Sequence, residues 1–239
     1  MTPFEASQIL AQHDHLSESE NILKTLWQNR NQQDEFTIFC ALLELGIKKD
    51  LQGSRKLLDD VISGEKEWTE FWSHRNLIEQ GILFEWHGEM CFHLADDPTA
   101  LDSLTRAASL GRDTSTLWLQ LGILYLKNRE LDLSVRYLKR SLELYKQPGL
   151  SIMDSKEANL GFFIGKHPLG FNPGAHEYLS TLLEVVKLAQ SRKSLKSVRD
   201  LVVEMIHQFP QDQRLYKVRL LIEKTLVAQG LRHGFSQHL

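Results

Sequence analysis

Apolar residues recur at intervals of three and four along most of the chain, and alternation of apolar with polar residues is nearly absent. Intervals of three and four place apolar side chains on one face of an α-helix, whereas strict alternation is typical of a strand. Polar turns, several with glycine or proline, divide the pattern into segments of about 12 to 16 residues. The sequence therefore predicts an all-α protein built from paired helices joined by short turns.

One helical pair repeats at a fixed interval. The segment at 115–148, STLWLQLGILYLKNRELDLSVRYLKRSLELYKQP, matches the preceding segment when it is shifted by 34 residues. The shift sets Gly122 on Gly88 and Leu138 on Leu104, so small positions stay small and large positions stay apolar. Because glycine has no Cβ, it lets two helix backbones approach closely. We therefore expect two consecutive hairpins that pack in the same way.

This pattern resembles the tetratricopeptide repeat, a helix-turn-helix unit of 34 residues. In residues 115–148 the resemblance is carried by Trp118, the pair Leu121 and Gly122, and Tyr125. The resemblance extends well over 81–148 and more loosely over most of the remaining chain. It implies a right-handed α-solenoid, in which each unit covers the apolar face that its neighbour leaves open.

Other stretches match the unit less closely. They lie at 6–28, 37–63 and 178–210, and a closing helix with polar residues on one side is expected at 213–230. A stack with an open end requires such a helix. We therefore expect residues 1–239 to form a single domain of about five helical pairs with a C-terminal capping helix.

Two insertions interrupt the period. The first, at about 65–80, is expected to be either an extra helix or an extension of the next unit's first helix. The second, at 149–177, is rich in glycine and proline and contains three phenylalanines. Insertions in a solenoid often project to one face and carry function, so part of the second is expected to be a short helix packed on the array.

Composition and charge narrow the function classes. The net charge of -3 over 239 residues gives no general attraction for nucleic acid. No apolar run approaches the ~18 residues that span a bilayer, and the N-terminal stretch lacks the pattern of a secretory signal. We therefore expect a cytoplasmic protein in which Cys40 and Cys91 are reduced core thiols.

Few residue groups suggest chemistry. His87, Cys91 and His93 lie close together in the sequence, and the first two have the spacing of metal ligands on a helix. The repeat register instead turns His87 and Cys91 inward, where packing accounts for them. The stretch GFFIGKH at 161–167 lacks the spacing and the hydroxyl residue of a phosphate-binding loop. We therefore expect no metal, no cofactor and no catalytic residue.

The densest basic run, SRKSLKSVRD, lies at 191–200. Nucleic-acid binding usually needs more cationic residues with aromatic rings nearby. The run is interpreted as a solvated turn between helices, and an acidic patch on a partner protein is the alternative.

In the resembling family, the first helices of successive units line a concave groove that binds peptides or partner proteins. Register places ten residues of this chain there: Ile82, Glu85, Glu89, Phe92, His93, Thr116, Leu119, Ile123, Leu126 and Lys127. Only Lys127 is cationic, so capture of a terminal carboxylate is disfavoured. What remains is a largely apolar groove with an acidic edge, suited to an amphipathic or apolar segment. The groove is either open to a partner or filled by the protein itself.

These features predict a non-catalytic scaffold or adaptor that binds a segment of a partner protein, because helical repeats offer surface rather than preorganised reactive groups. The alternative is a chaperone that shields an apolar segment of an exported or assembling protein. A metalloprotein or enzyme that uses His87, Cys91 and His93 is the least favoured hypothesis. Self-association is compatible with the sequence.

Overall fold

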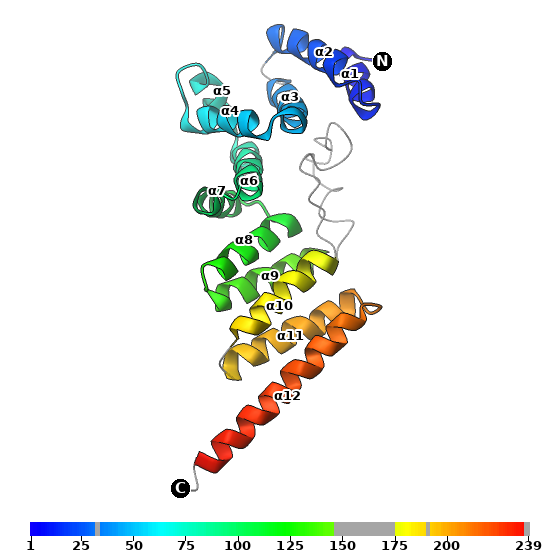
Figure 1. Ribbon diagram of the computed structural model, residues 1–239. Helices are drawn as coiled ribbons and strands as arrows, with labels where there is room; N and C mark the ends of the chain where they lie inside the picture. The colour runs from blue at the N-terminus through cyan, green and yellow to red at the C-terminus, as the bar shows by residue number, and fades with distance from the viewer. Residues whose placement is uncertain (32–33, 146–174, 190–191, 237–239) are drawn as a thin grey trace. The chain divides into compact units, whose positions relative to one another are not determined.

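The computed structural model describes the backbone of residues 1–31, 34–145, 175–189 and 192–236, and every regular element in these ranges is an α-helix (Figure 1). The prediction of an all-α helical repeat protein is confirmed. The helices are α1 (Pro3–Gln12), α2 (Leu16–Gln28), α3 (Glu35–Lys49), α4 (Leu51–Ser63), α5 (Thr69–Ser73), α6 (Leu77–His93), α7 (Asp97–Ser109), α8 (Ser115–Lys127), α9 (Leu131–Tyr145), α10 (Ala175–Leu188), α11 (Arg192–Gln208) and α12 (Gln213–Ser236).

The helices pair in chain order. Contacts join α1 to α2, α3 to α4, α6 to α7, α8 to α9 and α10 to α11, which are the pairs that the sequence predicts. The insertion at 65–80 contains a short extra helix, α5, and also the first turn of α6, so both expected alternatives occur together. The insertion at 149–177 lies outside the described residues up to residue 174.

Local sequence sets several helix starts. Thr2 and Glu5 form a reciprocal capping box at α1, and Asn76 with Glu79 does the same at α6. The side chain of Asp50 accepts a hydrogen bond from the first turn of α4. These side chains satisfy backbone N–H groups that have no partner inside a helix, so they fix where each helix begins.

The hairpins α6–α7 and α8–α9 have equivalent backbones. Ala95 and Arg129, which are 34 positions apart, both adopt the left-handed region at the turn, with φ of 58° and 62°. Gly88 lies against Leu104, and Gly122 lies against Leu138 in the same way. The small residues that follow in the second helices are also buried: Ala100, Ala107, Ser134 and Ser141. The repeated sequence thus produces a repeated close approach of two helices.

Gly88→Ala is expected to destabilise the protein more than Gly122→Ala. A Cβ at Gly88 would lie 2.6 Å from Leu104 Cγ and 3.1 Å from the Leu104 backbone nitrogen, whereas the corresponding distances from Gly122 to Leu138 are 2.9 and 3.4 Å. Overpacking of this kind costs about 1 to 3 kcal/mol, and the better helix propensity of alanine offsets about 1 kcal/mol of it. The loss in free energy of unfolding is measured by urea unfolding. Circular dichroism at about 222 nm follows the helix content during the titration.

Gly81→Ala serves as the matched control on α6. The nearest atoms that its Cβ would meet on each neighbour are Arg112 Cγ at 2.9 Å and Leu110 Cβ at 3.4 Å, and a small shift of the long Arg112 side chain relieves the closer contact. The control should therefore unfold at nearly the same urea concentration as the unmodified chain. Equal midpoints for Gly81→Ala and Gly88→Ala would contradict a role for backbone approach at Gly88.

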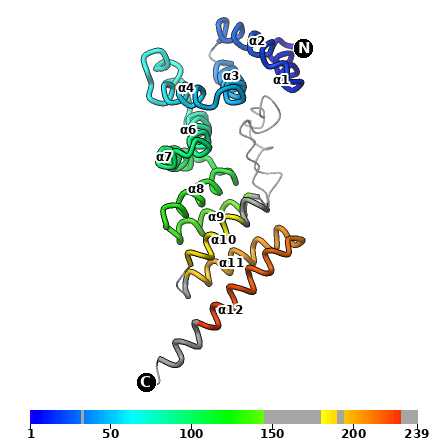
Figure 2. The backbone as a smooth tube through the Cα atoms, in the orientation of Figure 1, coloured from blue at the N-terminus to red at the C-terminus, as the bar shows by residue number. Residues whose placement is uncertain are grey.

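The described residues form two compact units. The first unit contains the described residues up to 112, and its apolar core joins side chains from α3, α4, α5 and α6. In the second unit, which begins at residue 113, α10 contacts α8 and α9, α11 contacts α9 and α10, and α12 contacts α11 (Figure 2). The expectation of one domain over 1–239 stays a prediction.

Helix α12 differs from the expected capping helix. Leu215, Val218 and Ile222 are buried, as an amphipathic helix requires. Over residues 213–228, where the structure describes the side chains of this helix, the outer side is not purely polar, because it exposes four large side chains: Tyr216, Leu220, Leu221 and Val227. None of the helices in the described ranges is long and apolar enough to cross a membrane.

Candidate functional site

The structure buries most of the predicted groove positions in the first unit. Ile82 packs into the apolar core, and Glu85 accepts a hydrogen bond of 2.6 Å from Arg112 Nε. Glu89 is 1% exposed. Phe92 is half-buried, and His93 is exposed. Glu85 and Glu89 therefore do not form the acidic edge that the sequence predicts.

In the second unit, too, some of the predicted groove positions are buried. Leu119 is fully buried and Leu126 is buried, while Thr116 and Ile123 are half-buried and Lys127 is exposed. The cause is packing between successive hairpins. In the first unit α6 contacts α4 as well as α7, and in the second unit α10 packs on the α8–α9 hairpin.

Burial at these positions agrees with the self-filled alternative rather than with an open apolar floor. A side chain without exposed surface cannot contact a partner in this conformation. Partner binding at the more exposed positions, Phe92, His93, Thr116, Ile123 and Lys127, stays a prediction.

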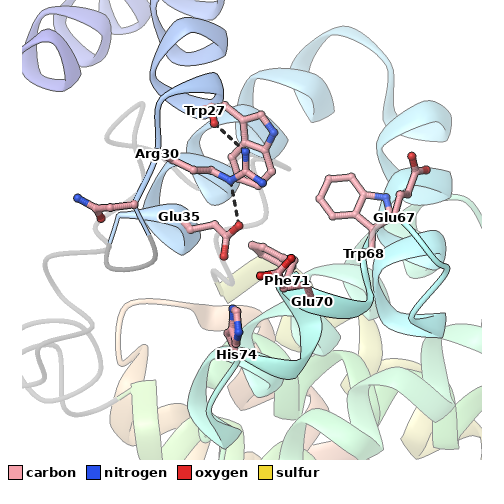
Figure 3. Close-up of a pocket in the computed structure, with 9 residues that line it drawn as sticks. Trp27, Arg30, Glu35, Glu67, Trp68, Glu70, Phe71 and His74 are labelled. Carbon is pink, nitrogen blue, oxygen red and sulfur yellow. Dashed lines mark hydrogen bonds and ion pairs between the residues drawn. The ribbon is translucent and has the colours of Figure 1, made fainter.

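A pocket in the first unit lies where the sequence predicted no site. It encloses about 490 Å³, within the range of about 300 to 1,000 Å³ that is usual for ligand sites. The lining comes from the end of α2, the start of α3 and the segment around α5 (Figure 3). The nine lining residues are Trp27, Arg30, Asn31, Glu35, Glu67, Trp68, Glu70, Phe71 and His74.

Aromatic rings form one wall of this pocket. The centroid of the Trp27 ring lies 6.1 Å from that of Trp68 and 6.0 Å from that of Phe71. Phe39 packs behind them, 4.8 Å from Phe71. These distances are in the range of favourable ring contacts, about 4.5 to 7 Å. Because Phe39 and Phe71 are also core residues, the wall is held in place by the core.

Charged groups complete the lining. The guanidinium of Arg30 lies 3.7 Å above the Trp27 ring, and Arg30 Nε donates a hydrogen bond of 2.9 Å to Glu35 Oε1. The other carboxylate oxygen of Glu35 accepts a bond of 3.1 Å from the buried guanidinium of Arg75. Two arginines thus neutralise Glu35. Glu67 and Glu70 are exposed and form no ion pair with any described residue.

Sequence reasoning missed the pocket for a clear reason. The stretch EKEWTEFWSHRN, with alternating aromatic and acidic residues, was a signal within the insertion at 65–80. Its partner, Trp27, lies in a different hairpin, and no sequence spacing relates the two. Only the packing of α5 against α2 and α3 brings Trp27 and Trp68 together.

The structure gives His87 a hydrogen-bonding role. Its Nε2 donates a bond of 2.7 Å to Asp59 Oδ1, and its Nδ1 lies 2.7 Å from Ser103 Oγ. Cys91 Sγ is 3.7 Å from the same Nε2, and His93 is exposed beside Phe92. Both ring nitrogens of His87 are therefore engaged by protein groups.

The three residues Ser103, His87 and Asp59 are the types that form a nucleophilic triad, and sequence reasoning did not join them. A nucleophile must reach its substrate. Ser103 is only 3% exposed in the contact between α6 and α7. The set is therefore interpreted as a hydrogen-bond network, buried at Ser103 and His87 and partly exposed at Asp59, that links α4, α6 and α7.

The two cysteines are expected to react slowly with 5,5′-dithiobis(2-nitrobenzoic acid) in the folded protein. Both are buried free thiols, and burial disfavours the charged thiolate, which raises the pKa of Cys40 and raises the pKa of Cys91 to about 11. At about pH 8 the thiolate fraction of Cys91 falls roughly a hundredfold below that of a free cysteine, before steric protection.

The reaction rate should rise as the pH approaches the raised pKa, because the thiolate is the reactive form. Unfolding in concentrated guanidinium chloride should release both thiols for rapid reaction. Equal rates for folded and unfolded protein would show that the thiols are accessible, against the burial described here.

The basic run at 191–200 is helical from Arg192 onward and forms the first turns of α11, so its interpretation as a turn between helices is wrong. Lys196 is exposed, and Arg199 pairs with the neighbouring Asp200 at 3.0 Å. Serine and leucine within the run allow a helix whose buried side includes Leu195 and Val198. The alternative, an acidic partner patch, stays a prediction.

Comparison with known proteins agrees with the repeat pattern. No family model matches the chain. The chain is similar to a TPR repeat-containing protein of Methanocaldococcus jannaschii, with 22% identity over 172 residues. The similarity covers 71% of this chain but 30% of the relative, so the chain spans less than a third of that protein's length. Together with the helical hairpins, this similarity supports a relationship to tetratricopeptide repeats.

Proposed function

We propose that the chain is a non-catalytic scaffold that binds a segment of a partner protein. The observation that carries this proposal is the pair of equivalent hairpins, α6–α7 and α8–α9, in which Gly88 and Gly122 make the same close approach 34 positions apart. Helical repeats as a class provide extended surfaces for recognition rather than a single reactive cleft. Similarity to a TPR repeat-containing protein supports the same interpretation.

Affinity capture followed by reconstitution tests the proposal. The folded chain, immobilised at either end, is expected to retain one protein specifically from a lysate of its own source. That protein, made separately, should then bind the chain with a defined stoichiometry in isothermal titration calorimetry. The proposal fails if no retained protein binds the purified chain.

A chaperone role is the second candidate, and the exposed apolar side chains of α12 favour it. Apolar patches on a surface often mark sites that cover apolar surface on another molecule. The captured partner distinguishes the two functions. A chaperone client should aggregate when it is produced alone and stay soluble when the chain is co-expressed, whereas the partner of a scaffold should be soluble in both cases.

A further inference from the structure

The pocket lined by Trp27, Trp68 and Phe71 has a defined chemical preference. Its rings offer electron-rich faces, and its unpaired charges within the described part of the chain are the carboxylates of Glu67 and Glu70. Aromatic faces and carboxylates both attract cations. The pocket therefore favours a positively charged group over a neutral or anionic one.

Arg30 shows which cation this environment accepts. Its guanidinium carbon lies 3.7 Å from the centroid of the Trp27 ring, and the guanidinium bonds Glu35 from that position. Figure 3 shows Arg30 and Glu35 on one side of the pocket and Trp68 with Glu67 on the other. The Trp27 side thus already holds a guanidinium, whereas Glu67 beside Trp68 and Glu70 beside Phe71 (Figure 3) form no ion pair with a described cation.

We propose that this pocket binds the guanidinium of an arginine side chain from a partner protein, with Trp68 as the aromatic contact and Glu67 and Glu70 as the anionic contacts. Arginine is favoured over lysine because a planar guanidinium both stacks on rings and bonds carboxylates through two parallel donors. The ligand's identity as a protein side chain rests on the proposed scaffold function. The chemical preference rests on the pocket alone.

Arg30 opposes a second guanidinium in the same pocket, because like charges repel at short distance. Its removal leaves Glu35 paired with Arg75, so the local fold keeps a partner for that carboxylate. Arg30→Met should therefore increase affinity for an added guanidinium by about threefold to tenfold. This direction is opposite to the loss of affinity that removal of a binding residue would cause.

Titration with N-acetyl-arginine amide tests the proposal, with N-acetyl-citrulline amide as a neutral probe of nearly the same shape. Binding is followed by the indole N–H resonances of Trp27 and Trp68 in nitrogen-15 correlation spectra. The resonance of Trp118, whose indole donates to Asp113 in the second unit, is the internal reference. The arginine probe should shift only the two pocket resonances, and the citrulline and lysine analogues should bind about tenfold more weakly.

Charge variants complete the test. Glu67→Gln combined with Glu70→Gln should weaken binding of the arginine probe about tenfold, because both carboxylates lose their charge. Glu18→Gln, an exposed change on α2 outside the pocket, should leave binding unchanged. Equal binding of arginine and citrulline probes, equal binding of lysine, or no effect of the double variant would overturn the proposal.

The result is independent of the capture experiment. If the arginine probe binds as expected and no protein partner is found, the pocket assignment stands and the scaffold function fails. If a partner binds equally well to the chain with Glu67→Gln and Glu70→Gln, and the arginine probe does not bind, the scaffold function stands and the pocket assignment fails.

Discussion

Leu119→Asp is expected to unfold the second unit. Leu119 is fully buried on α8, so the change removes a core side chain and leaves a carboxylate without solvent. Loss of a buried leucine costs about 2 to 5 kcal/mol, and burial of an unpaired polar group adds about 1 to 3 kcal/mol or more. The total approaches the whole stability of a typical domain, about 5 to 15 kcal/mol. Thermal unfolding followed by circular dichroism measures the loss of helix.

Thr116→Asp is the matched control for this prediction. Thr116 lies one turn earlier on α8 and is half-buried, so the new carboxylate can reach water. It also lies in the first turn of the helix, where a negative charge is favourable. The control should melt within a few degrees of the unmodified chain. If Leu119→Asp melts at the same temperature as the control, Leu119 lines an open groove, as the first alternative from the sequence holds.

Arg75→Met is expected to have the second largest effect, a loss of about 3 to 5 kcal/mol. The Arg75 side chain is 3% exposed, and its guanidinium donates to Glu35 Oε2 and to the Phe71 carbonyl, each at 3.1 Å. The same guanidinium lies 4.5 Å from the Phe71 ring centroid. Its removal leaves one oxygen of a nearly buried carboxylate and one buried carbonyl without their donors, while methionine replaces only the apolar part of the side chain.

Arg30→Met provides the control, because Arg30 bonds the other oxygen of Glu35 from a more exposed position. Exposed ion pairs contribute about 0 to 1 kcal/mol, so this variant should unfold close to the unmodified chain. Adding Glu35→Gln to Arg75→Met should recover part of the loss, since the nearly buried oxygen that loses its donor Arg75 then no longer belongs to a charged group. The urea midpoints of the three variants measure these losses of stability. Equal losses for Arg75→Met and Arg30→Met would contradict the statement that Arg75 contributes more because it is buried.

The Arg30 variant of the pocket proposal and the Arg75 prediction both concern Glu35, and they remain separable. Arg75 stabilises the packing of α3 against α5, because it bonds Glu35 on α3 and the Phe71 carbonyl on α5. Unfolding measurements report this stability. Arg30 determines whether a second guanidinium is repelled, which the probe titration reports. A variant that binds the arginine probe more tightly without a change in melting temperature therefore acts on guanidinium binding and not on stability.

Sequence alone determined the features that depend on neighbours along the chain. The spacing of apolar residues predicted the helices, and the 34-residue shift predicted the equivalent hairpins at Gly88 and Gly122. These predictions succeeded because a helical hairpin is a local structure: its turn, its caps and its close approach lie within a few dozen residues.

Only the tertiary structure decided which apolar faces are covered. The repeat pattern placed Leu119 and Glu89 on the same helix faces as exposed groove residues, but contacts between successive hairpins bury both. The pocket has the same origin, because Trp27 and Trp68 meet through the packing of one hairpin against an insertion. The physical reason is that periodicity specifies the direction of a side chain from its own helix, whereas burial depends on what other segments place against that face.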